Sequence, residues 1–461
     1  MLNSFNFKKF GDRILITNDL GRFCFLSDDE FKDFITENEL KDVELNKKLK
    51  EDYFIYDGPR QIFVQNAGME LRNYKRYLFT GTSLHIFVLT NYCNQSCIYC
   101  QASVNKKDSM MMSKETARKA VDLAIQSPSK FLTFEFQGGE PLANFETLRF
   151  IVEYTKSITT DKIIQFAVVS NLLLLEDYML DFLIENNVSI STSVDGNEKL
   201  HNINRPANGV NSFNSVREGI KKIKLRGYSV SAIQTTTRHS LNMWKELVDQ
   251  YVELGIKSIF IRPLTQLGYA EKNWDTIGYK PEEFLDFYRN AIYYIISLAK
   301  TGIDISEGHA KIFLRKIIGH DSQNYMELRS PCGAGIGQLA YYYDGNIYTC
   351  DEGRMLAEMG DKSFCIGNVY SADFKDIMSN PVCKSVAVAS CLENIPSCMD
   401  CVYVPYCGTC PVINYAKYNT IFCKEPESFR CSIYKGILDI LFEILLYGDG
   451  EAKQILYSWA E

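Results

Sequence analysis

Strand-like and helix-like runs alternate six times along the chain, from residue 83 to about residue 302. The strand-like runs are short and apolar, and the runs between them repeat apolar residues at helical spacing. Such alternation predicts parallel βαβ units, either curved into a partial barrel or laid flat as a doubly wound sheet. The predicted strands are Leu84–Leu89, Phe131–Phe136, Ile163–Val169, Ser189–Val194, Ser229–Thr235 and Ser258–Leu264. The predicted helices are 113–125, 145–156, 176–185, 213–225, 243–254 and 284–299.

The two ends of the chain have different patterns. Alternating runs at Arg13–Thr17 and Arg22–Leu26 flank a turn, and Ser27 then precedes three acidic residues, which is a helix-start signal. This predicts a hairpin followed by helices. After Gly308 the pattern changes to short strands, at 338–343 and 346–348, with turns and cysteines. The apolar stretch Ile437–Tyr447 predicts a packed C-terminal helix, since a membrane span needs roughly 20 apolar residues.

Length and charge exclude some function classes. A chain of 461 residues is too long for one ordinary core, so we expect two or three domains. Lys and Arg total 50 against 57 Asp and Glu, without long blocks of either sign. This charge distribution does not indicate binding to nucleic acid or to an anionic membrane. The first residues lack a basic segment followed by an apolar one, so we expect a cytoplasmic protein.

The chain has 15 cysteines, and their distribution is uneven. Cys24 stands alone, three lie between 93 and 100, and eleven lie between 332 and 431. Disulfides do not persist in a reducing compartment, so this density indicates metal or cluster binding.

The three cysteines Cys93, Cys97 and Cys100 follow directly after the first predicted strand. A cubane cluster has four irons, so three thiolates leave one iron open to a small molecule. Structural zinc is the alternative, but its sites usually pair two C-x2-C clamps. The carboxyl end of a parallel strand is also where α/β folds place their active sites. Position and chemistry therefore agree.

Polar and glycine residues also end the next three predicted strands. Gly138 and Gly139 allow close backbone approach to a ligand, and Glu140 offers a carboxylate to a cationic group. Asn171 ends the third strand, Ser193 ends the fourth, and Arg205 follows shortly after. Each has an ordinary interpretation as a turn or strand-end cap. Together they predict a site for a polar ligand that carries hydroxyls and a carboxylate.

These motifs, in this order, resemble the radical S-adenosylmethionine (radical SAM) enzymes over about residues 83 to 302. The resemblance implies that Cys93, Cys97 and Cys100 hold a [4Fe–4S] cluster whose open iron binds the amino and carboxylate groups of S-adenosylmethionine. It also implies roles for the strand-end residues. Tyr99 flanks the adenine, Gly138, Gly139 and Glu140 contact the methionine amino group, Ser193 and Arg205 face its carboxylate, and Asn171 contacts the ribose.

The later cysteines resemble the SPASM extension of peptide-modifying radical enzymes, which carries auxiliary clusters. By this resemblance, Cys332, Cys350 and Cys410 belong to a first auxiliary cluster. Cys398, Cys401, Cys407 and one later cysteine, with Cys431 favoured over Cys423, belong to a second. The fourth ligand of the first stays open: an open iron, or one of Cys365, Cys383, Cys391 and Cys423.

A zinc site is a further alternative for the cysteines of the C-terminal region. The pairs Cys398/Cys401 and Cys407/Cys410 also suit a zinc ribbon, although Cys332 and Cys350 favour iron. The last pair is spaced C-x2-C, where sulfatase-maturing relatives usually have C-x3-C.

Asp351, which follows a predicted ligand, matches the aspartate suggested as proton acceptor in those relatives. The alternative is that Asp351 is a solvated turn residue.

The N-terminal unit resembles the winged-helix element with which maturases of ribosomal peptides bind a leader peptide by strand addition. A plain cap on the barrel is the alternative. The N-terminal unit, the segment 84–102 and the segment 406–411 together most resemble the maturase of the His-Xaa-Ser peptide system.

The fold expected is therefore α/β. It comprises a winged-helix-like unit at 1–75, a partial (β/α)6 barrel of the TIM-like radical SAM type at 83–305, a SPASM domain at 325–436 and a C-terminal helix at 437–461. The resemblance implies hydrogen abstraction from a side chain of a ribosomally made precursor peptide, followed by a C–C or C–heteroatom cross-link. It further implies a reducing partner such as flavodoxin or ferredoxin, and neither nucleic acid nor membrane as partner. The alternatives are an anaerobic sulfatase maturase, and a non-catalytic iron–sulfur or zinc protein that binds peptides.

Overall fold

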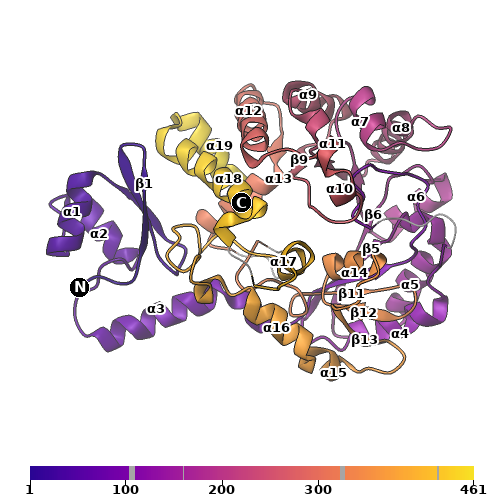
Figure 1. Ribbon diagram of the computed structural model, residues 1–461, viewed down its shortest axis with the longest axis horizontal. Helices are drawn as coiled ribbons and strands as arrows, with labels where there is room; N and C mark the ends of the chain where they lie inside the picture. Colours follow the sequence, from indigo (N-terminus) through magenta and orange to yellow (C-terminus); the bar gives the residue numbers. More distant parts are fainter. Residues whose placement is uncertain (103–108, 159, 322–327, 423–424) are drawn as a thin grey trace.

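The computed structural model describes residues 1–102, 109–158, 160–321, 328–422 and 425–461. Its N-terminal unit is a three-stranded antiparallel sheet with helices beside it, at the left of Figure 1. The sheet order is β1–β2–β3. The elements of this unit are β1 (Asn6–Phe10), β2 (Arg13–Thr17), β3 (Phe23–Leu26), α1 (Asp28–Glu37), α2 (Val43–Glu51) and α3 (Arg60–Tyr74).

The start of α1 is fixed by a capping box. The Ser27 hydroxyl accepts a hydrogen bond from the Glu30 N–H, and the Glu30 carboxylate accepts one from the Ser27 N–H. Ile16 on β2 and Phe34 on α1 then pack in a small core of their own. The predicted hairpin is present, and β1 adds an edge strand that the sequence pattern did not predict.

A ten-stranded sheet forms the centre of the molecule, in the order β10-β9-β8-β7-β6-β5-β4-β11-β12-β13. All neighbours from β10 to β11 pair in parallel. Six of these strands are the predicted ones. The parallel strands are β4 (Leu84–Val88), β5 (Phe131–Gln137), β6 (Ile163–Val169), β7 (Ser189–Ser193), β8 (Val230–Thr235), β9 (Ser258–Arg262), β10 (Ser306–Glu307) and β11 (Gln338–Tyr341).

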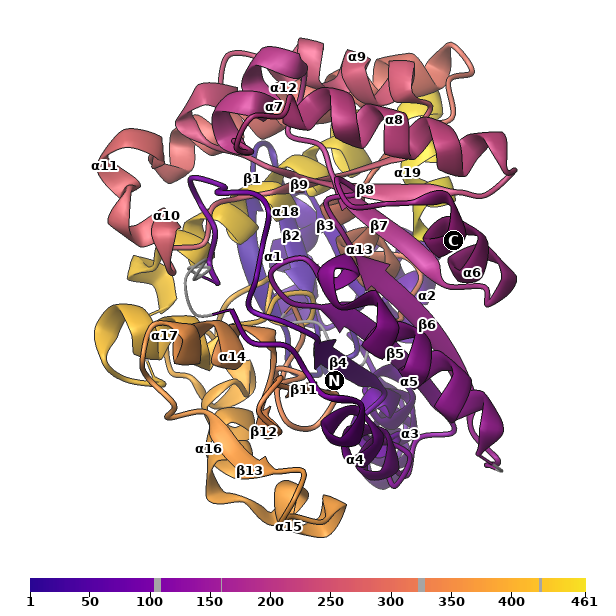
Figure 2. The same ribbon diagram turned by 90° about the vertical axis from the view of Figure 1, so that its right-hand side faces the viewer.

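Helices cover the outer side of this curved sheet, as Figure 2 shows. Their apolar faces join the strands in one large core, which includes Leu148 of α5 and Ile292 of α12. The covering helices are α4 (Lys114–Ala124), α5 (Phe145–Ser157), α6 (Asp177–Glu185), α7 (Glu198–Asn204), α8 (Ser212–Leu225), α9 (Trp244–Leu254), α12 (Pro281–Lys300) and α13 (Gly308–Ile317). Two short helices, α10 (Tyr269–Lys272) and α11 (Trp274–Ile277), lie in the segment after β9, where the Tyr269 N–H donates to the Cys100 oxygen. This is the predicted mixed α/β fold with an open parallel sheet.

The C-terminal third continues the same sheet. Strand β11 pairs with β4, and β12 (Asn346–Tyr348) and β13 (Cys365–Asn368) follow in antiparallel order. The prediction of one C-terminal helix at 437–461 is wrong, because α18 (Phe429–Tyr447) ends at Gly448 and a second helix, α19 (Gly450–Ala460), starts after the Asp449 cap. No helix among the described residues is long and apolar enough to cross a membrane. The remaining helices are α14 (Asp351–Glu358), α15 (Phe374–Ser379), α16 (Pro381–Ala389), α17 (Pro411–Tyr418), α18 (Phe429–Tyr447) and α19 (Gly450–Ala460).

The N-terminal sheet packs against the segment 399–406. Asn6 donates to the backbone oxygens of Met399 and Cys401, at 3.0 and 3.2 Å, and the Thr17 hydroxyl donates to that of Val402 at 2.7 Å. Phe23 packs edge-on against Phe442 of α18. The N-terminal unit is thus docked on the cysteine-rich part of the chain.

Candidate active site

Two glycines bring the end of β5 against the cysteine loop. The N–H of Gly139 donates to the Thr90 oxygen at 2.8 Å, and that of Glu140 donates to the Tyr92 oxygen at 2.7 Å. A Cβ on Gly138 would lie 2.4 Å from the Thr90 oxygen, and one on Gly139 would lie 2.1 Å from the Tyr92 oxygen. Neither distance is possible for a side chain, so the backbone contact that positions the loop requires glycine.

The cysteine loop itself is held by polar side chains. The Asn171 amide donates to the Asn94 side-chain oxygen at 2.7 Å and lies 3.8 Å from the Cys93 sulfur. An Arg205 nitrogen lies 3.9 Å from the Cys97 sulfur. Burial raises the pKa of Cys93 and of Cys97 to about 12. Both thiols therefore hold their protons until a metal displaces them.

The Glu140 carboxylate faces protein groups rather than open space. It accepts hydrogen bonds from the Ser170 hydroxyl at 2.7 Å and from the N–H groups of Leu142 and Asn171 at 3.0 and 2.8 Å. Burial raises the pKa of Glu140 to about 7. This carboxylate ties the end of β5 to the end of β6. It is absent from the lining of the cavity described below.

Arg205 forms a buried ion pair with a residue that the sequence reasoning did not select. Its Nε lies 3.2 Å from an Asp195 oxygen, and Asp195 is fully buried. The Tyr99 hydroxyl donates to the same carboxylate at 2.6 Å, and the guanidinium lies 5.2 Å from the Tyr99 ring centre. Asp195 lies two residues after the end of β7, so its place near a strand end was the available signal.

A cavity of about 610 Å³ connects these groups. The three loop cysteines, Tyr99, the two glycines, Asn171, Ser193 and Arg205 all line it. Its lining also includes Glu135 and Gln137 of β5, Arg262 of β9 and four residues of α14: Asp351, Glu352, Arg354 and Met355. The predicted cofactor-binding residues other than Glu140 are thus brought to one cavity, and part of its wall comes from the cysteine-rich region.

Asp351 is the first residue of α14 and pairs with Arg354, whose side chain is 1% exposed. The Arg354 Nε donates to the Asp351 carboxylate at 3.1 Å, and another guanidinium nitrogen lies 3.5 Å from the Gln137 side-chain oxygen. The Asp351 carboxylate is therefore held at the cavity wall by Arg354. Arg354 was missed because nothing in its local sequence marks it as buried.

The cysteines predicted for the first auxiliary cluster come together. Cys332, Cys350 and Cys410 share one buried apolar cluster with Leu267, Leu356, Phe364 and Val412. Burial raises the pKa of Cys350 and of Cys410, and each of these thiols also lies close enough to Cys332 to be affected by its charge. Cys350 caps α14 and Cys410 caps α17, so two helix starts set their positions.

The four cysteines predicted for the second auxiliary cluster surround one small cavity of about 30 Å³. Cys398 and Cys401 come from the turns before Tyr403, Cys407 from the following loop, and Cys431 from the first turn of α18. Cys423 lies outside the described residues. In the described part of the chain, no three His, Cys, Asp or Glu side chains converge as ligands of one metal ion.

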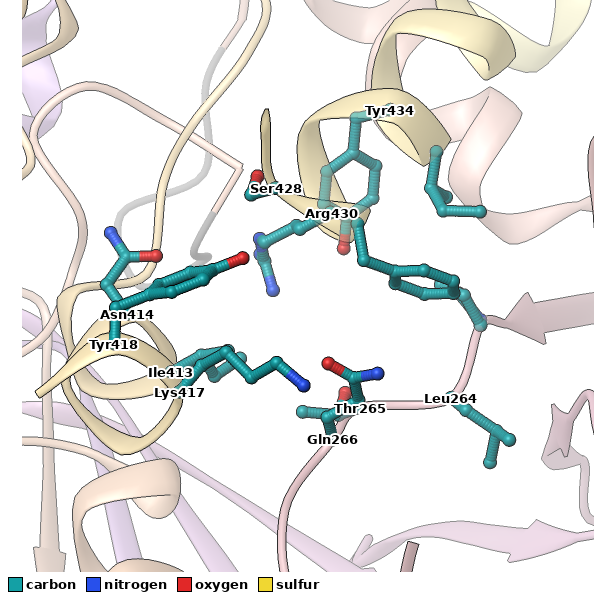
Figure 3. Close-up of a pocket in the computed structure, with 13 residues that line it drawn as sticks. Leu264, Thr265, Gln266, Ile413, Asn414, Lys417, Tyr418, Ser428, Arg430 and Tyr434 are labelled. Atoms are coloured by element: carbon teal, nitrogen blue, oxygen red, sulfur yellow. The ribbon is translucent and has the colours of Figure 1, made fainter. Parts of the chain in front are cut away.

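A narrower recess of about 50 Å³ adjoins the main cavity, with which it shares Pro263, Leu264 and Thr265. It lies between the loop after β9 and the helices α17 and α18, as Figure 3 shows. Its two charged side chains, Lys417 and Arg430, are both cationic. This recess could not be predicted from the sequence, because its walls come from segments about 150 residues apart.

Comparison with known proteins agrees with this geometry. Residues 87–250 match the model of the Radical SAM superfamily. The radical SAM cyclopropyl synthase TigE of Paramaledivibacter caminithermalis is 24% identical over 91% of this chain and 87% of its own. A cysteine-type anaerobic sulfatase-maturating enzyme of Clostridium perfringens is 27% identical over 58% of this chain and 74% of its own.

Solved structures share the fold. Native anSMEcpe with bound AdoMet and Kp18Cys peptide superposes with a TM-score of 0.69 at 21% identity, covering 81% of this chain and 99% of its own. Streptococcus suis SuiB bound to precursor peptide SuiA superposes with a TM-score of 0.56 at 15% identity, covering 91% of this chain and 97% of its own.

The fold, the matched domain and the site define a radical SAM enzyme. Residues 87–250 form a radical SAM domain, and the relatives named above are a radical SAM cyclopropyl synthase and an anaerobic sulfatase-maturating enzyme. This class implies a [4Fe–4S] cluster with bound S-adenosylmethionine, and the three free thiols at the wall of the 610 Å³ cavity fit that requirement.

Proposed function

We propose that this enzyme matures a ribosomally made precursor peptide by abstracting a hydrogen from one of its side chains and forming a C–C or C–heteroatom cross-link. The observation that supports this most is the shared cavity, because the loop cysteines and the α14 residues of the cysteine-rich region form its walls together. A radical formed at one wall would thus meet its substrate beside the auxiliary sites.

The residues of the cavity would bind and orient the two reactants. When bound, the cluster and S-adenosylmethionine supply a 5′-deoxyadenosyl radical. Tyr99 would flank the adenine, Gly138 and Gly139 would contact the methionine amino group, and Asn171 would contact the ribose. The guanidinium of Arg205, fixed by Asp195, would face the carboxylate together with Ser193. Glu140 would act on the ligand indirectly, since its carboxylate holds Ser170 and Asn171.

Asp351 is the proposed proton acceptor for the oxidised substrate residue. It lines the cavity, and the buried Arg354 holds its carboxylate in place. A carboxylate that is ionised and close to substrate can take the proton released as a cross-link forms.

The auxiliary cysteines would hold two [4Fe–4S] clusters that accept the second electron. Cys332, Cys350 and Cys410 would bind the first, and Cys398, Cys401, Cys407 and Cys431 the second, with flavodoxin or ferredoxin as reductant. Free thiols and clusters of this kind need a reducing compartment, for which we propose the cytoplasm. The recess beside Lys417 and Arg430 would admit the peptide next to the reacting residue.

Residues 1–75 are proposed as the leader-binding unit, next to a barrel at 83–305, a SPASM domain at 325–436 and a C-terminal helical segment at 437–461. The outer strands β1 and β3 each pair with β2 within the N-terminal sheet. An extended leader could add a strand there, because backbone hydrogen bonds demand little sequence identity. The match to TigE supports this assignment, since it spans 91% of the chain.

Formylglycine formation is the second candidate, because sulfatase-maturating enzymes are among the relatives. A non-catalytic peptide-binding protein is not supported, since the chain is an enzyme by its class.

Co-expression with short peptides encoded beside the enzyme tests the proposal. Mass spectrometry should show that the peptide loses two hydrogens and carries no aldehyde. The variant Asp351→Asn should form less of this product while S-adenosylmethionine cleavage continues. An aldehyde that reacts with a hydrazine would establish formylglycine instead. A peptide of unshifted mass with every encoded candidate would contradict both.

A further inference from the structure

The recess between α17, α18 and the loop after β9 carries positive charge in its walls. Lys417 comes from the last turn of α17, and Arg430 comes from the first turn of α18. Figure 3 shows both side chains reaching into the recess from these two helices. Among the described residues, no Asp or Glu lines it. An anion that enters the recess would therefore meet a cation on two sides, and the start of α18 adds to this attraction, since a helix N-terminus favours an anion.

The loop after β9 is tied to the start of α18. The Leu264 N–H donates to the Tyr279 hydroxyl at 2.7 Å, and the Tyr279 ring packs against the Phe429 ring with 5.8 Å between ring centres. Leu264 and Phe429 both line the recess. Two of its walls are therefore held together by contacts that do not depend on a ligand.

A buried carboxylate, that of Glu425, joins the two helices. It accepts hydrogen bonds from the Asn414 amide of α17 at 2.8 Å and from the Ser428 hydroxyl, at the start of α18, at 3.4 Å. The segments that carry Lys417 and Arg430 thus have a fixed relative position. A ligand of both cations would not need to order these segments on binding, which favours affinity.

The volume and position of the recess limit what can bind there. A cavity needs roughly 10–15 Å³ to hold one water. At about 50 Å³, the recess has room for a group of about three to four heavy atoms, which is the size of a carboxylate. Its walls share Pro263, Leu264 and Thr265 with the 610 Å³ cavity. A peptide in the main cavity can therefore place a small charged group in the recess.

We propose that this recess binds a carboxylate of the substrate peptide, through Lys417 and Arg430, while the residue to be modified lies in the main cavity. The carboxylate belongs to an acidic side chain close to the modified residue, or to the C-terminus of the peptide. Both sources offer the same planar anion, which forms charge-assisted hydrogen bonds with both cations. The inference rests on the proposed function for the peptide and adds the chemistry that selects it.

The test uses the full chain, reconstituted anaerobically with its clusters and with S-adenosylmethionine bound. One probe is acetyl-Gly-Asp-Gly-amide, with a side-chain carboxylate, and the other is acetyl-Gly-Gly-Gly, with a C-terminal one. A carbodiimide joins a bound carboxylate to a neighbouring lysine amine, and mass spectrometry of protein fragments locates the amide. Lys272, an exposed lysine of α10 outside both cavities, is the reference. We expect about tenfold more label on Lys417 than on Lys272. The probe that labels Lys417 identifies the source of the carboxylate.

Matched variants show whether both cations take part. Arg430→Gln should lower the labelling of Lys417 about tenfold, and Arg430→Lys should restore most of it. Lys272→Gln should leave it unchanged. In the unsubstituted protein, acetate should protect Lys417, and this measurement decides even if Arg430→Gln loses its iron. Labelling of Lys417 no higher than that of Lys272 with both probes would overturn the proposal. Protection by inorganic phosphate and not by acetate would also overturn it, because the recess would then select a different anion.

Failure of the proposed function gives a different result. If no encoded peptide is modified, the labelling of Lys417 still decides whether the recess binds a carboxylate. If a peptide is modified, Lys417→Gln should raise its KM about tenfold with little change in kcat. Replacing the acid of the peptide by its amide should have the same effect, and the two changes together should add little. A KM that is unaffected by Lys417→Gln would contradict the proposed role of the recess in peptide binding.

Discussion

The cysteines at 93–100 and those after 332 have contrasting surroundings. Around the first group lie charged and amide side chains, among them Asn171, Arg205 and Asp195, arranged at the ends of parallel strands. In the second, Leu392, Ile395 and Val404 pack with Cys398, and buried apolar side chains also pack with Cys332, Cys350 and Cys410. Polar surroundings suit a group that binds a charged small molecule, whereas apolar ones suit a group that only exchanges electrons.

The largest expected effect comes from removing one cysteine of each group. Cys97→Ala should abolish reductive cleavage of S-adenosylmethionine, because the cluster loses one of its three ligands. Cys401→Ala should leave that cleavage measurable and abolish peptide modification. The amount of 5′-deoxyadenosine is measured by liquid chromatography, and the mass of the peptide is measured by mass spectrometry. Equal loss of cleavage in both variants would remove the distinction between the two groups.

Gly139→Ala should come next, since its Cβ would collide with the Tyr92 oxygen. The cysteine loop would have to move, so we expect loss of most S-adenosylmethionine binding in an anaerobically reconstituted protein. Gly68→Ala is the matched control, because its Cβ meets nothing within 4 Å inside α3. It should stabilise the protein by about 1 kcal/mol, through helix propensity, and leave binding unchanged. Normal binding in Gly139→Ala would show that the backbone contact does not position the loop.

The two buried arginines allow a comparison of stability. Asp195→Asn leaves Arg205 without its buried partner, which should lower the free energy of unfolding by about 3–5 kcal/mol. Asp351→Asn should cost less, because the Asp351 side chain is 17% exposed and water can solvate the pair. Urea denaturation of the protein without clusters measures both. A larger loss of unfolding free energy for Asp351→Asn than for Asp195→Asn would contradict this prediction.

The pH dependence of stability should give the smallest effect. Burial raises the Glu140 pKa from the ordinary 4.5 to about 7, so the folded protein holds this proton more tightly than the unfolded chain does. Stability from this group is therefore present at low pH and is lost as pH rises from 4.5 to 7, by up to about 3 kcal/mol.

Glu140→Gln should lack that slope and also weaken S-adenosylmethionine binding. Glu307→Gln is the control: its pKa is also about 7 through burial, and it caps α13 away from the cysteines. Glu307→Gln should remove a similar pH dependence of stability while S-adenosylmethionine binding stays unchanged. Identical binding losses in the two variants would indicate a general effect of stability on the site.

The sequence was informative where short patterns determine local structure. The six strands and the order of strand-end motifs could be predicted, because apolar alternation and glycine placement act over a few residues. Asp195 and Arg354 could not be selected, since their importance depends on burial and on partners that only the fold supplies. The docking of β1–β3 on 399–406 was likewise invisible, because nothing in either segment encodes a contact almost 400 residues away.

The pairing of β4 with β11 has a consequence for synthesis of the chain. Leu84 of β4 lies opposite Gln338 of β11, so one edge of the central sheet stays uncovered until the ribosome has made more than 250 further residues. An uncovered parallel edge is slow to pair and prone to association with other chains. A fragment that ends after the parallel strands should therefore aggregate, and chaperones would be expected to hold the nascent protein until its last third emerges.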